Sequence, residues 1–293
     1  MSIALLLGIF FLLLVFGILV KAFRRVWAAF LTIIILAIII LAVLAVTGLV
    51  ATGNQQFMNW VHTVNPFVAE QAEPAPTGLS SYYLEPLSPD ASSSTSEGSV
   101  SYGAIIQLGD LDLYGRSTFA HIRLSESREP GNNGQERNEY INVDPEGWRN
   151  FKINGNWANN RCHLIGYQFS GLNDELRNLS IGTSYLNKGT EGSGMDESNP
   201  DGMLFYEQRL DDWLHENPEK DLDLYVRPIY EGSNTTPTYY YMQWVGFDTD
   251  NTQVPIDIGG HSGTVSGAVS GVLLTNQSPS YSIDYATGII TEK

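Results

Sequence analysis

The sequence predicts an α+β domain that follows apolar and low-complexity N-terminal segments. From Val100 onward, short runs rich in β-branched and aromatic residues are separated by Gly, Asn, Asp and Pro. Helical periodicity is scarcer, and its clearest case is Met203–His215, where leucines and Trp213 recur on one face. Strands that frame a few helices are typical of α+β folds. The predicted strands are Ala104–Leu108, Tyr140–Val143, Leu222–Tyr230 and Tyr239–Phe247.

Charge is distributed unevenly along the 293 residues, which include 16 Lys and Arg, 32 Asp and Glu, and one Cys. No acidic residue precedes Glu70, so residues 70–293 carry 13 basic against 32 acidic side chains, a net charge of −19. This balance argues against a protein that coats nucleic acid, which needs a positive surface. It does not exclude a small catalytic site that contacts few phosphates. The single cysteine excludes an intramolecular disulfide framework and a Cys-rich zinc site.

Residues 1–53 are predicted to form a transmembrane helical hairpin, with spans at about residues 3–20 and 27–50. Both runs are apolar and close to the roughly 20 residues that cross a bilayer. The basic residues Lys21, Arg24 and Arg25 lie between them, which predicts a cytoplasmic turn. A cleaved signal peptide would carry positive charge before its apolar run instead. We therefore expect a multi-pass cell-membrane protein with two spans and an extracellular soluble domain; a single anchor is the alternative.

Residues 54–100 are predicted to be a low-complexity extracellular linker. This stretch is rich in Pro, Ser, Glu and Ala, and the run Ser92–Ser99 cannot bury enough apolar surface to order itself. The soluble domain is then expected over residues 101–293. Within it, Asp174–Asn178 and Thr183–Asn187 are predicted to be short helical segments.

The segment Asn160–Gln168 carries the most informative motif, Asn-Arg-Cys-His-Leu-Ile-Gly-Tyr-Gln. It resembles the Asp-Arg-Gly-His signature of the DNA/RNA non-specific endonucleases. Five further blocks are similar to that family and occur in the same order. They are Leu111–Arg116, Gly147-Trp148, Arg177–Asn187, Gly202–Glu207 and Pro228–Gly232. The resemblance covers about residues 101–250 and is strongest to the membrane-linked competence DNA-entry nucleases.

This resemblance implies a ββα-metal nuclease domain with a mixed or antiparallel sheet. His163 would be the general base, since a neutral imidazole is available near pH 7. Asn187 would be the direct protein ligand of a single Mg²⁺, with Mn²⁺ as the alternative ion. Arg161 would donate to phosphate oxygens, and Asn178 would position the phosphate or support the site. Glu207 would hold a metal-bound water.

The implied function is a membrane-anchored extracellular endonuclease that hydrolyses DNA, with RNA as a second candidate substrate. Strong sequence preference is not expected, because contacts to the phosphate backbone carry no base information. DNA uptake and nucleotide scavenging are the candidate roles. The expected partners are nucleic acid, the lipid bilayer and membrane proteins of DNA uptake.

Two departures from the family pattern keep other functions open. Asn160 occupies the position where most relatives have Asp, and Asp211 the position where some have Arg. A catalytically degenerate nuclease-fold binding module is therefore one alternative, and it predicts no turnover with Mg²⁺. A delivered nuclease toxin is another, although the N-terminal hairpin argues against it. Residues 251–293 are β-like and fall mostly outside the resemblance.

Overall fold

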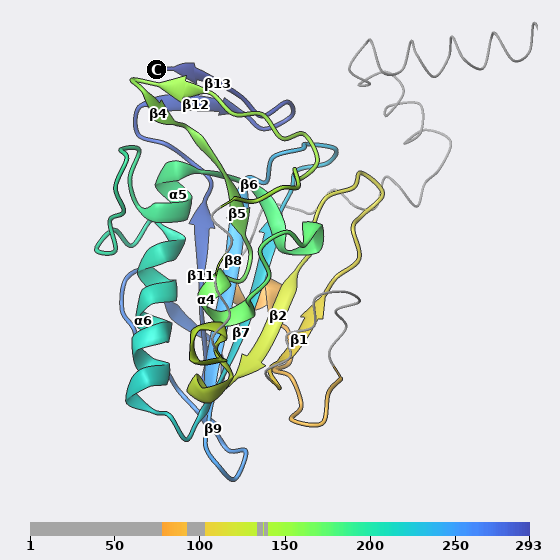
Figure 1. The fold of residues 1–293 in the computed structure, drawn as a ribbon, viewed down its shortest axis with the longest axis vertical. Helices are drawn as coiled ribbons and strands as arrows, with labels where there is room; N and C mark the ends of the chain where they lie inside the picture. Colours follow the sequence, from red (N-terminus) through yellow and green to blue (C-terminus); the bar gives the residue numbers. More distant parts are fainter. Residues whose placement is uncertain (1–77, 93–102, 134–136, 138–139) are drawn as a thin grey trace, which may run out of the picture. The chain divides into compact units, whose positions relative to one another are not determined.

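The computed structural model describes residues 78–92, 103–133, 137 and 140–293. All of them belong to a unit that spans residues 70–293. The predicted membrane spans lie outside the described residues, as do residues 54–77 and 93–100 of the predicted linker. The described part is an α+β domain with one large antiparallel sheet and a few helices, as predicted (Figure 1).

The sheet has seven strands in the order β1-β2-β7-β8-β11-β10, with β9 paired to β8. Every pairing in it is antiparallel. The strands are β1 (Ile105–Leu108), β2 (Ala120–Leu124), β7 (Asp221–Ile229), β8 (Tyr239–Phe247), β9 (Gln253–Val254), β10 (Gly263–Ser266) and β11 (Val269–Thr275). The two long central strands, β7 and β8, agree closely with the prediction because each is a run of β-forming residues bounded by turn residues. The predicted strand Tyr140–Val143 is wrong: the Asn142 backbone N–H donates to Asp174 Oδ1, 2.8 Å away, and not to a neighbouring strand.

Helix α6 (Met203–Glu216) covers one face of this sheet, which confirms the predicted helix (Figure 1). Its buried residues recur at helical spacing, from Met203 through Tyr206 and Leu210 to Leu214. They join one core cluster with the inward side chains of β2, β7 and β8, which alternate along each strand. This core lies between α6 and the sheet.

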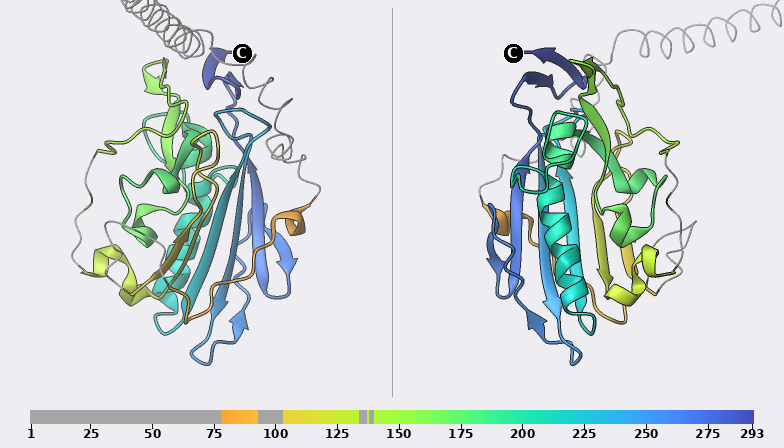
Figure 2. Two further views of the ribbon diagram at one scale, coloured as in Figure 1. Left: turned by 90° about the vertical axis from the view of Figure 1, so that its right-hand side faces the viewer. Right: turned by 60° about the vertical axis from the view of Figure 1, so that its left-hand side comes forward.

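The opposite face of the sheet is covered by residues 78–92, which run past it on the side away from α6 (Figure 2). The segment begins with the 3₁₀ helix η1 (Leu79–Tyr82), and Leu79 and Tyr82 pack against Tyr225 and Tyr241 of the sheet. The expectation of a flexible linker is therefore wrong for residues 78–92. Apolar side chains are present in this short stretch, and the sheet supplies polar partners for its backbone.

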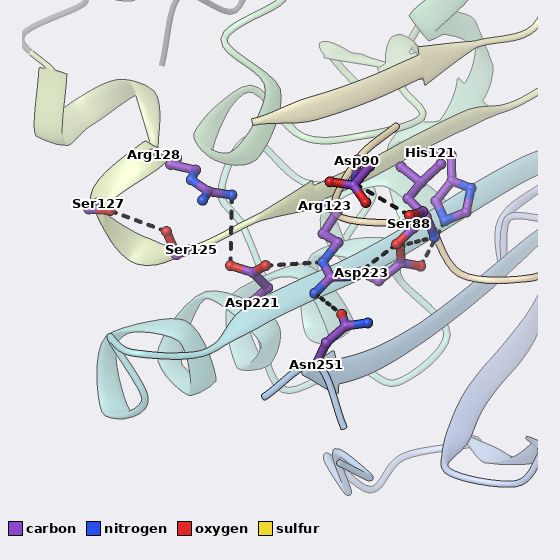
Figure 3. Close-up of polar contacts among 11 residues, drawn as sticks. Ser88, Asp90, His121, Arg123, Ser125, Ser127, Arg128, Asp221, Asp223 and Asn251 are labelled. Atoms are coloured by element: carbon purple, nitrogen blue, oxygen red, sulfur yellow. Dashed lines mark hydrogen bonds and ion pairs between the residues drawn. The ribbon is translucent and has the colours of Figure 1, made fainter. Parts of the chain in front are cut away.

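Those partners form a buried polar row beneath the segment (Figure 3). Asp223 is fully buried, and its carboxylate accepts the Leu87 backbone N–H at 2.8 Å and lies 2.7 Å from His121 Nε2. Arg123 donates to the Leu87 carbonyl at 2.9 Å and pairs with Asp221. Because buried polar groups are costly without partners, these contacts hold the segment in one register on the sheet.

The remaining elements are short. They are η2 (Glu126–Arg128), η3 (Pro130–Asn133), β3 (Lys152–Ile153), β4 (Asn156–Trp157), β5 (Asn159–His163), α4 (Tyr167–Ser170), η4 (Leu176–Asn178), β6 (Leu179–Thr183), α5 (Ser184–Lys188), β12 (Tyr281–Asp284) and β13 (Ile289–Glu292). The β12–β13 hairpin packs on the β3–β4 hairpin through Tyr281, Ile290 and Ala158 (Figure 1). The C-terminal region thus completes the sheet and supports a second hairpin.

Two blocks of the sequence resemblance are joined by the buried Arg116. Its guanidinium pairs with Asp112 at 2.6 Å and donates to the carbonyls of Gly232 and Asn234. It also lies over the ring of Tyr230, 4.2 Å from the centroid. The arginine therefore links the loop before β2 to the loop after β7, which is a structural role.

Removing the Asp223 carboxylate should destabilise the protein strongly. Asp223→Ala leaves the buried Leu87 N–H and the buried His121 Nε2 without their hydrogen-bond partner, so we expect a loss of about 3 kcal/mol in the free energy of unfolding. Urea denaturation of the purified protein measures it. Asp212→Ala removes the same charge from an exposed position of α6 and should cost less than about 0.5 kcal/mol. Equal losses in the two variants would contradict the role of Asp223.

Stability should also depend on pH through Glu129, which lies buried beside Asp211. Burial and the neighbouring Asp211 raise the Glu129 pKa to about 8. An acid whose pKa is raised by folding stabilises the protein below its unfolded pKa and loses that contribution as pH rises toward 8, by up to about 1.4 kcal/mol per pH unit. We expect Glu129→Gln to weaken this loss between pH 5 and pH 8, measured by urea denaturation at both values. A variant that loses as much stability as the wild type would contradict this assignment.

Candidate active site

A cleft of about 640 Å³ opens beside β5, α5 and α6. Four of the five predicted site residues line it: Arg161, His163, Asn187 and Glu207. The fifth, Asn178, does not reach the cleft. The structure therefore brings together side chains that are up to 46 positions apart in the sequence.

Two paired strands and a short helix, β5, β6 and α5, lie next to one another (Figure 1), and residues of β5 and α5 line the cleft. β5 pairs antiparallel with β6, with His163 opposite Leu179, and β6 leads directly into α5. The Thr183 side chain caps α5 by accepting the Leu186 N–H at 2.9 Å. Gly189, at φ 78°, ends the helix in the left-handed region. This ββα arrangement carries His163 at the end of β5 and Asn187 in the last turn of α5.

The imidazole of His163 is oriented by a backbone hydrogen bond. Its Nε2 lies 3.2 Å from the Asn173 carbonyl oxygen, which can only accept, so Nε2 carries the proton. The lone pair is then on Nδ1. Burial lowers the His163 pKa to about 4, and the nearby positive charge of Arg137 acts in the same direction. The ring is therefore neutral at pH 7, with an unprotonated nitrogen available.

The side-chain amide of Asn187 is held by Cys162 of β5. The Cys162 thiol donates to Asn187 Oδ1 across 3.0 Å and also contacts the Met203 sulfur at 3.5 Å. Burial raises the pKa of Cys162 well above its usual value, so the thiol keeps the proton that it donates. This contact joins β5 to α5 and fixes the rotamer of Asn187. A carboxamide oxygen has a second lone pair, which remains for another ligand.

Glu207, in the second turn of α6, brings a carboxyl group to the same cleft. Burial raises its pKa to about 7, the positive charge of Arg137 opposes this rise, and Asp211 adds to it. Among the residues that the structure describes, no side chain hydrogen-bonds or ion-pairs with the Glu207 carboxyl. A nearby cation would favour the ionised form of this carboxyl group.

Asn178 and Asn160 both make contacts that position neighbouring segments, and of the two only Asn160 lines the cleft. Asn178 is fully buried, and its side chain exchanges two 3.0 Å hydrogen bonds with the backbone of Ile165. It thereby holds the loop that follows His163. Asn160 Oδ1 accepts the Ser184 hydroxyl at 3.3 Å, at the start of α5. The amide at position 160 therefore still makes a contact between β5 and α5.

Arg161 lines the cleft but already has a partner. Its guanidinium pairs with Asp144 at 2.6 Å and lies 4.6 Å from the centroid of the Trp148 ring. A phosphate would have to share or displace the exposed Asp144 carboxylate. The predicted phosphate contact of Arg161 is thus compatible with its location, although the ion pair reduces its free charge.

Arg137 is a cleft residue that the sequence analysis missed. It is exposed, lies 5.3 Å from the Tyr167 ring centroid, and acts electrostatically on both His163 and Glu207. No acidic side chain within the described part of the chain pairs with it. It lies in a Gly-, Asn- and Glu-rich stretch without a recognised motif, so only its positive charge in an acidic domain could have indicated it.

The donor set in the cleft fits a hard divalent cation. Asn187 Oδ1 is an oxygen that can bind the cation directly, and the unpartnered Glu207 carboxyl can hold a coordinated water. Mg²⁺ and Mn²⁺ prefer oxygen ligands together with several waters. The described residues contain no cluster of three or more His, Cys, Asp or Glu side chains suited to enclose a metal. The fit therefore depends on few protein ligands, with water completing the coordination.

Comparisons with known proteins identify one family and two similar solved structures. The model of the DNA/RNA non-specific endonuclease family matches residues 98–244. One solved structure, an extracellular nuclease, is 37% identical with a TM-score of 0.54, over 65% of this chain and 94% of that chain. Another, an extracellular endonuclease, is 32% identical with a TM-score of 0.57, over 75% of this chain and 100% of that chain.

A more distant structural match shows only the fold. The Sda1 nuclease, solved with a bound zinc ion, is 19% identical with a TM-score of 0.50, over 64% of this chain and 80% of that chain. A search of curated proteins found no match.

The prediction of a multi-pass membrane protein is corrected by these findings. The two more similar structures are named extracellular nucleases, not membrane proteins. Within the part of the chain that the structure describes, no helix is both long enough and apolar enough to cross a bilayer. The apolar runs that motivated the prediction, at residues 3–20 and 27–50, lie outside that part. The apolar runs and the basic residues between them were the basis of the predicted localisation, and the comparisons do not support it.

The family membership predicted from the motifs is confirmed by the match to the family model and by two solved structures that share more than 30% sequence identity with this chain. Both the ordered motifs and the ββα cleft are explained by one assignment. The chain belongs to the DNA/RNA non-specific endonuclease family, whose members hydrolyse nucleic acid.

Proposed function

We propose that the chain is a Mg²⁺-dependent endonuclease that hydrolyses DNA phosphodiester bonds without strong sequence preference, with RNA as a second candidate substrate. One observation carries the proposal: a neutral histidine with a free Nδ1 shares a cleft with an amide oxygen and an unpartnered carboxyl group. Endonucleases of this family are metal-dependent. The names of the two similar extracellular nucleases support activity outside the cell, where DNA uptake or nucleotide scavenging would use it.

His163 would act as the general base. Its Nδ1 would take a proton from a water that attacks the phosphorus, while the Nε2–H stays bonded to the Asn173 carbonyl. A pKa of about 4 makes the free imidazole a weak base. A phosphodiester in the cleft would raise that pKa, because a nearby negative charge favours the imidazolium form. The imidazole would therefore be neutral in the free enzyme and would become a stronger base once substrate is bound.

Asn187 and Glu207 would hold the divalent cation. The amide oxygen of Asn187 would bind it directly, and the Cys162 thiol would keep that oxygen aimed into the cleft. Glu207 would ionise and hold a coordinated water. When bound, the cation neutralises charge on the phosphate and on the leaving oxygen.

Arg137 would be the principal phosphate contact, with Arg161 as a second one. A guanidinium matches two phosphate oxygens, and Arg137 has no acidic partner among the described residues, whereas Arg161 is paired with Asp144. The alternative of a catalytically degenerate binding module has less support. Asn160 keeps a contact to α5. In addition, the proposed base, the oxygen groups for the cation, and Arg137 all lie in one cleft.

The catalytic proposal predicts that His163→Ala abolishes nicking of supercoiled plasmid. Loss of a general base should reduce the rate by about 10²- to 10⁴-fold, and EDTA should stop the wild-type reaction. His261→Ala is the matched control, because His261 is exposed and pairs with Asp201 outside the cleft. Gel quantification of nicked plasmid in Mg²⁺ provides the measurement. Cleavage that persists in His163→Ala or in EDTA would refute the proposal.

The phosphate contact predicts that Arg137→Ala lowers kcat/KM on plasmid by about a hundredfold, since a preorganised donor to the transition state is lost. Arg209→Ala removes the same charge from a position outside the cleft, where the guanidinium donates to the carbonyls of Glu197 and Phe205. That control should keep activity within about twofold of wild type. If the two variants lose activity equally, general charge and not a specific contact explains the effect.

A further inference from the structure

One side of the cleft is formed by a hairpin whose exposed indole has no role in the catalysis proposed above. Trp157, on β4, lines the cleft together with His163 and Asn187 and remains 53% exposed. Tryptophan is highly buried on average in folded proteins, and this one instead faces a polar cleft that also holds the proposed catalytic residues.

We propose that Trp157 and the β3–β4 hairpin form a stacking subsite for an unpaired nucleobase next to the scissile phosphate. The enzyme would then act preferentially on single-stranded or locally unpaired nucleic acid. This inference rests on the proposed nuclease function and names its substrate class. Aromatic stacking of a base contributes about 1–3 kcal/mol and tolerates any sequence, which suits a non-specific enzyme.

The hairpin is rigid enough to present the ring in one orientation. Asn154 and Gly155 occupy its turn with φ of 51° and 83°, the left-handed pair of a type I′ turn. Lys152 is paired with Trp157 across the two strands. The adjacent residues Ile153 and Ala158 pack on the C-terminal β12–β13 hairpin.

The hairpin is also tied to the helix that carries the proposed metal ligand. The carbonyl oxygen of Trp157 accepts the hydroxyl of Ser184, 2.5 Å away, and Ser184 is the first residue of α5. Asn187 lies less than one turn further along the same helix. The position of the indole is therefore set relative to the catalytic cleft, which a base adjoining the reacting phosphate requires.

The charges around the indole favour a nucleic acid over an apolar partner. The Lys152 ammonium lies 4.7 Å from the centroid of the Trp157 ring, and the Arg161 guanidinium lies 4.6 Å from that of Trp148 in the same cleft. In a domain with 13 basic residues against 32 acidic ones, cations placed beside cleft aromatics match the alternating bases and phosphates of a strand. Exposed Tyr140 adds a further ring to the cleft.

The preference for unpaired bases follows from access to the ring face. In a duplex each base is already stacked on both sides, so the indole can reach a base only if the duplex is locally opened. That opening costs a few kcal/mol. The bases of a single strand have accessible faces, so stacking on the indole should contribute to the binding free energy only for a single-stranded substrate.

The test compares steady-state cleavage of a labelled single-stranded oligonucleotide and of the same sequence in a hairpin duplex. Trp157→Ala should raise KM for the single strand about tenfold while kcat changes less than twofold, and should leave both constants for the duplex nearly unchanged. Trp157→Phe keeps a ring and should restore most of the affinity. Leu113→Ala removes an apolar side chain that is 71% exposed but lies outside the cleft, and should behave as wild type.

A binding measurement separates this inference from the catalytic one. In EDTA, 2-aminopurine fluorescence of the single-stranded oligonucleotide should be quenched by the wild type and by Trp157→Phe, but much less by Trp157→Ala. If the wild type binds and quenches but cleaves neither substrate, the proposed function fails while the stacking subsite stands. Equal KM changes on both substrates, or unchanged quenching in Trp157→Ala, would overturn the subsite.

Discussion

The pairing of β5 with β6 is the constraint on which the cleft depends. It sets His163 opposite Leu179 and Cys162 opposite Ser180, and β6 then enters α5 without an intervening loop. The Cys162 thiol bonds to Asn187 Oδ1 and so joins the first strand to the helix. A slip of one residue would turn His163 inward and Cys162 outward. The register of this strand pair therefore sets the positions of both the proposed base, His163, and the proposed metal ligand, Asn187.

The large sheet supports this small unit because it is buried on both faces. α6 covers one face and contributes Glu207 to the cleft, while residues 78–92 cover the other. The second face would otherwise expose tyrosines of β7 and β8 together with the polar row around Asp223. Antiparallel sheets commonly leave one face exposed to solvent. Here residues 78–92 cover that face instead. The rigidity of the sheet, in turn, fixes the direction in which α6 presents its carboxyl group.

The parts of the fold that were predictable are those with a strong local pattern. β7 and β8 follow from runs of β-forming residues bounded by turn residues, and α6 follows from helical spacing. The motif blocks indicated four residues that do line the cleft. Packing partners distant in sequence decided the rest. Residues 78–92 have a linker-like composition and are ordered by Asp223 and Arg123, more than thirty positions away. Arg137 carries no motif, and only the folded cleft brings it near His163 and Glu207.

The central claim is that this cleft binds one hard cation through Asn187, and a crystal structure of the protein soaked in Mn²⁺ tests it most directly. The account predicts one anomalous difference peak in the cleft, at a bonding distance of about 2.1–2.2 Å from Asn187 Oδ1, with Glu207 one water away. It also predicts that the same soak of Asn187→Ala crystals shows no such peak. A cation bound instead to the imidazole of His163, or a peak only outside the cleft, would contradict the account.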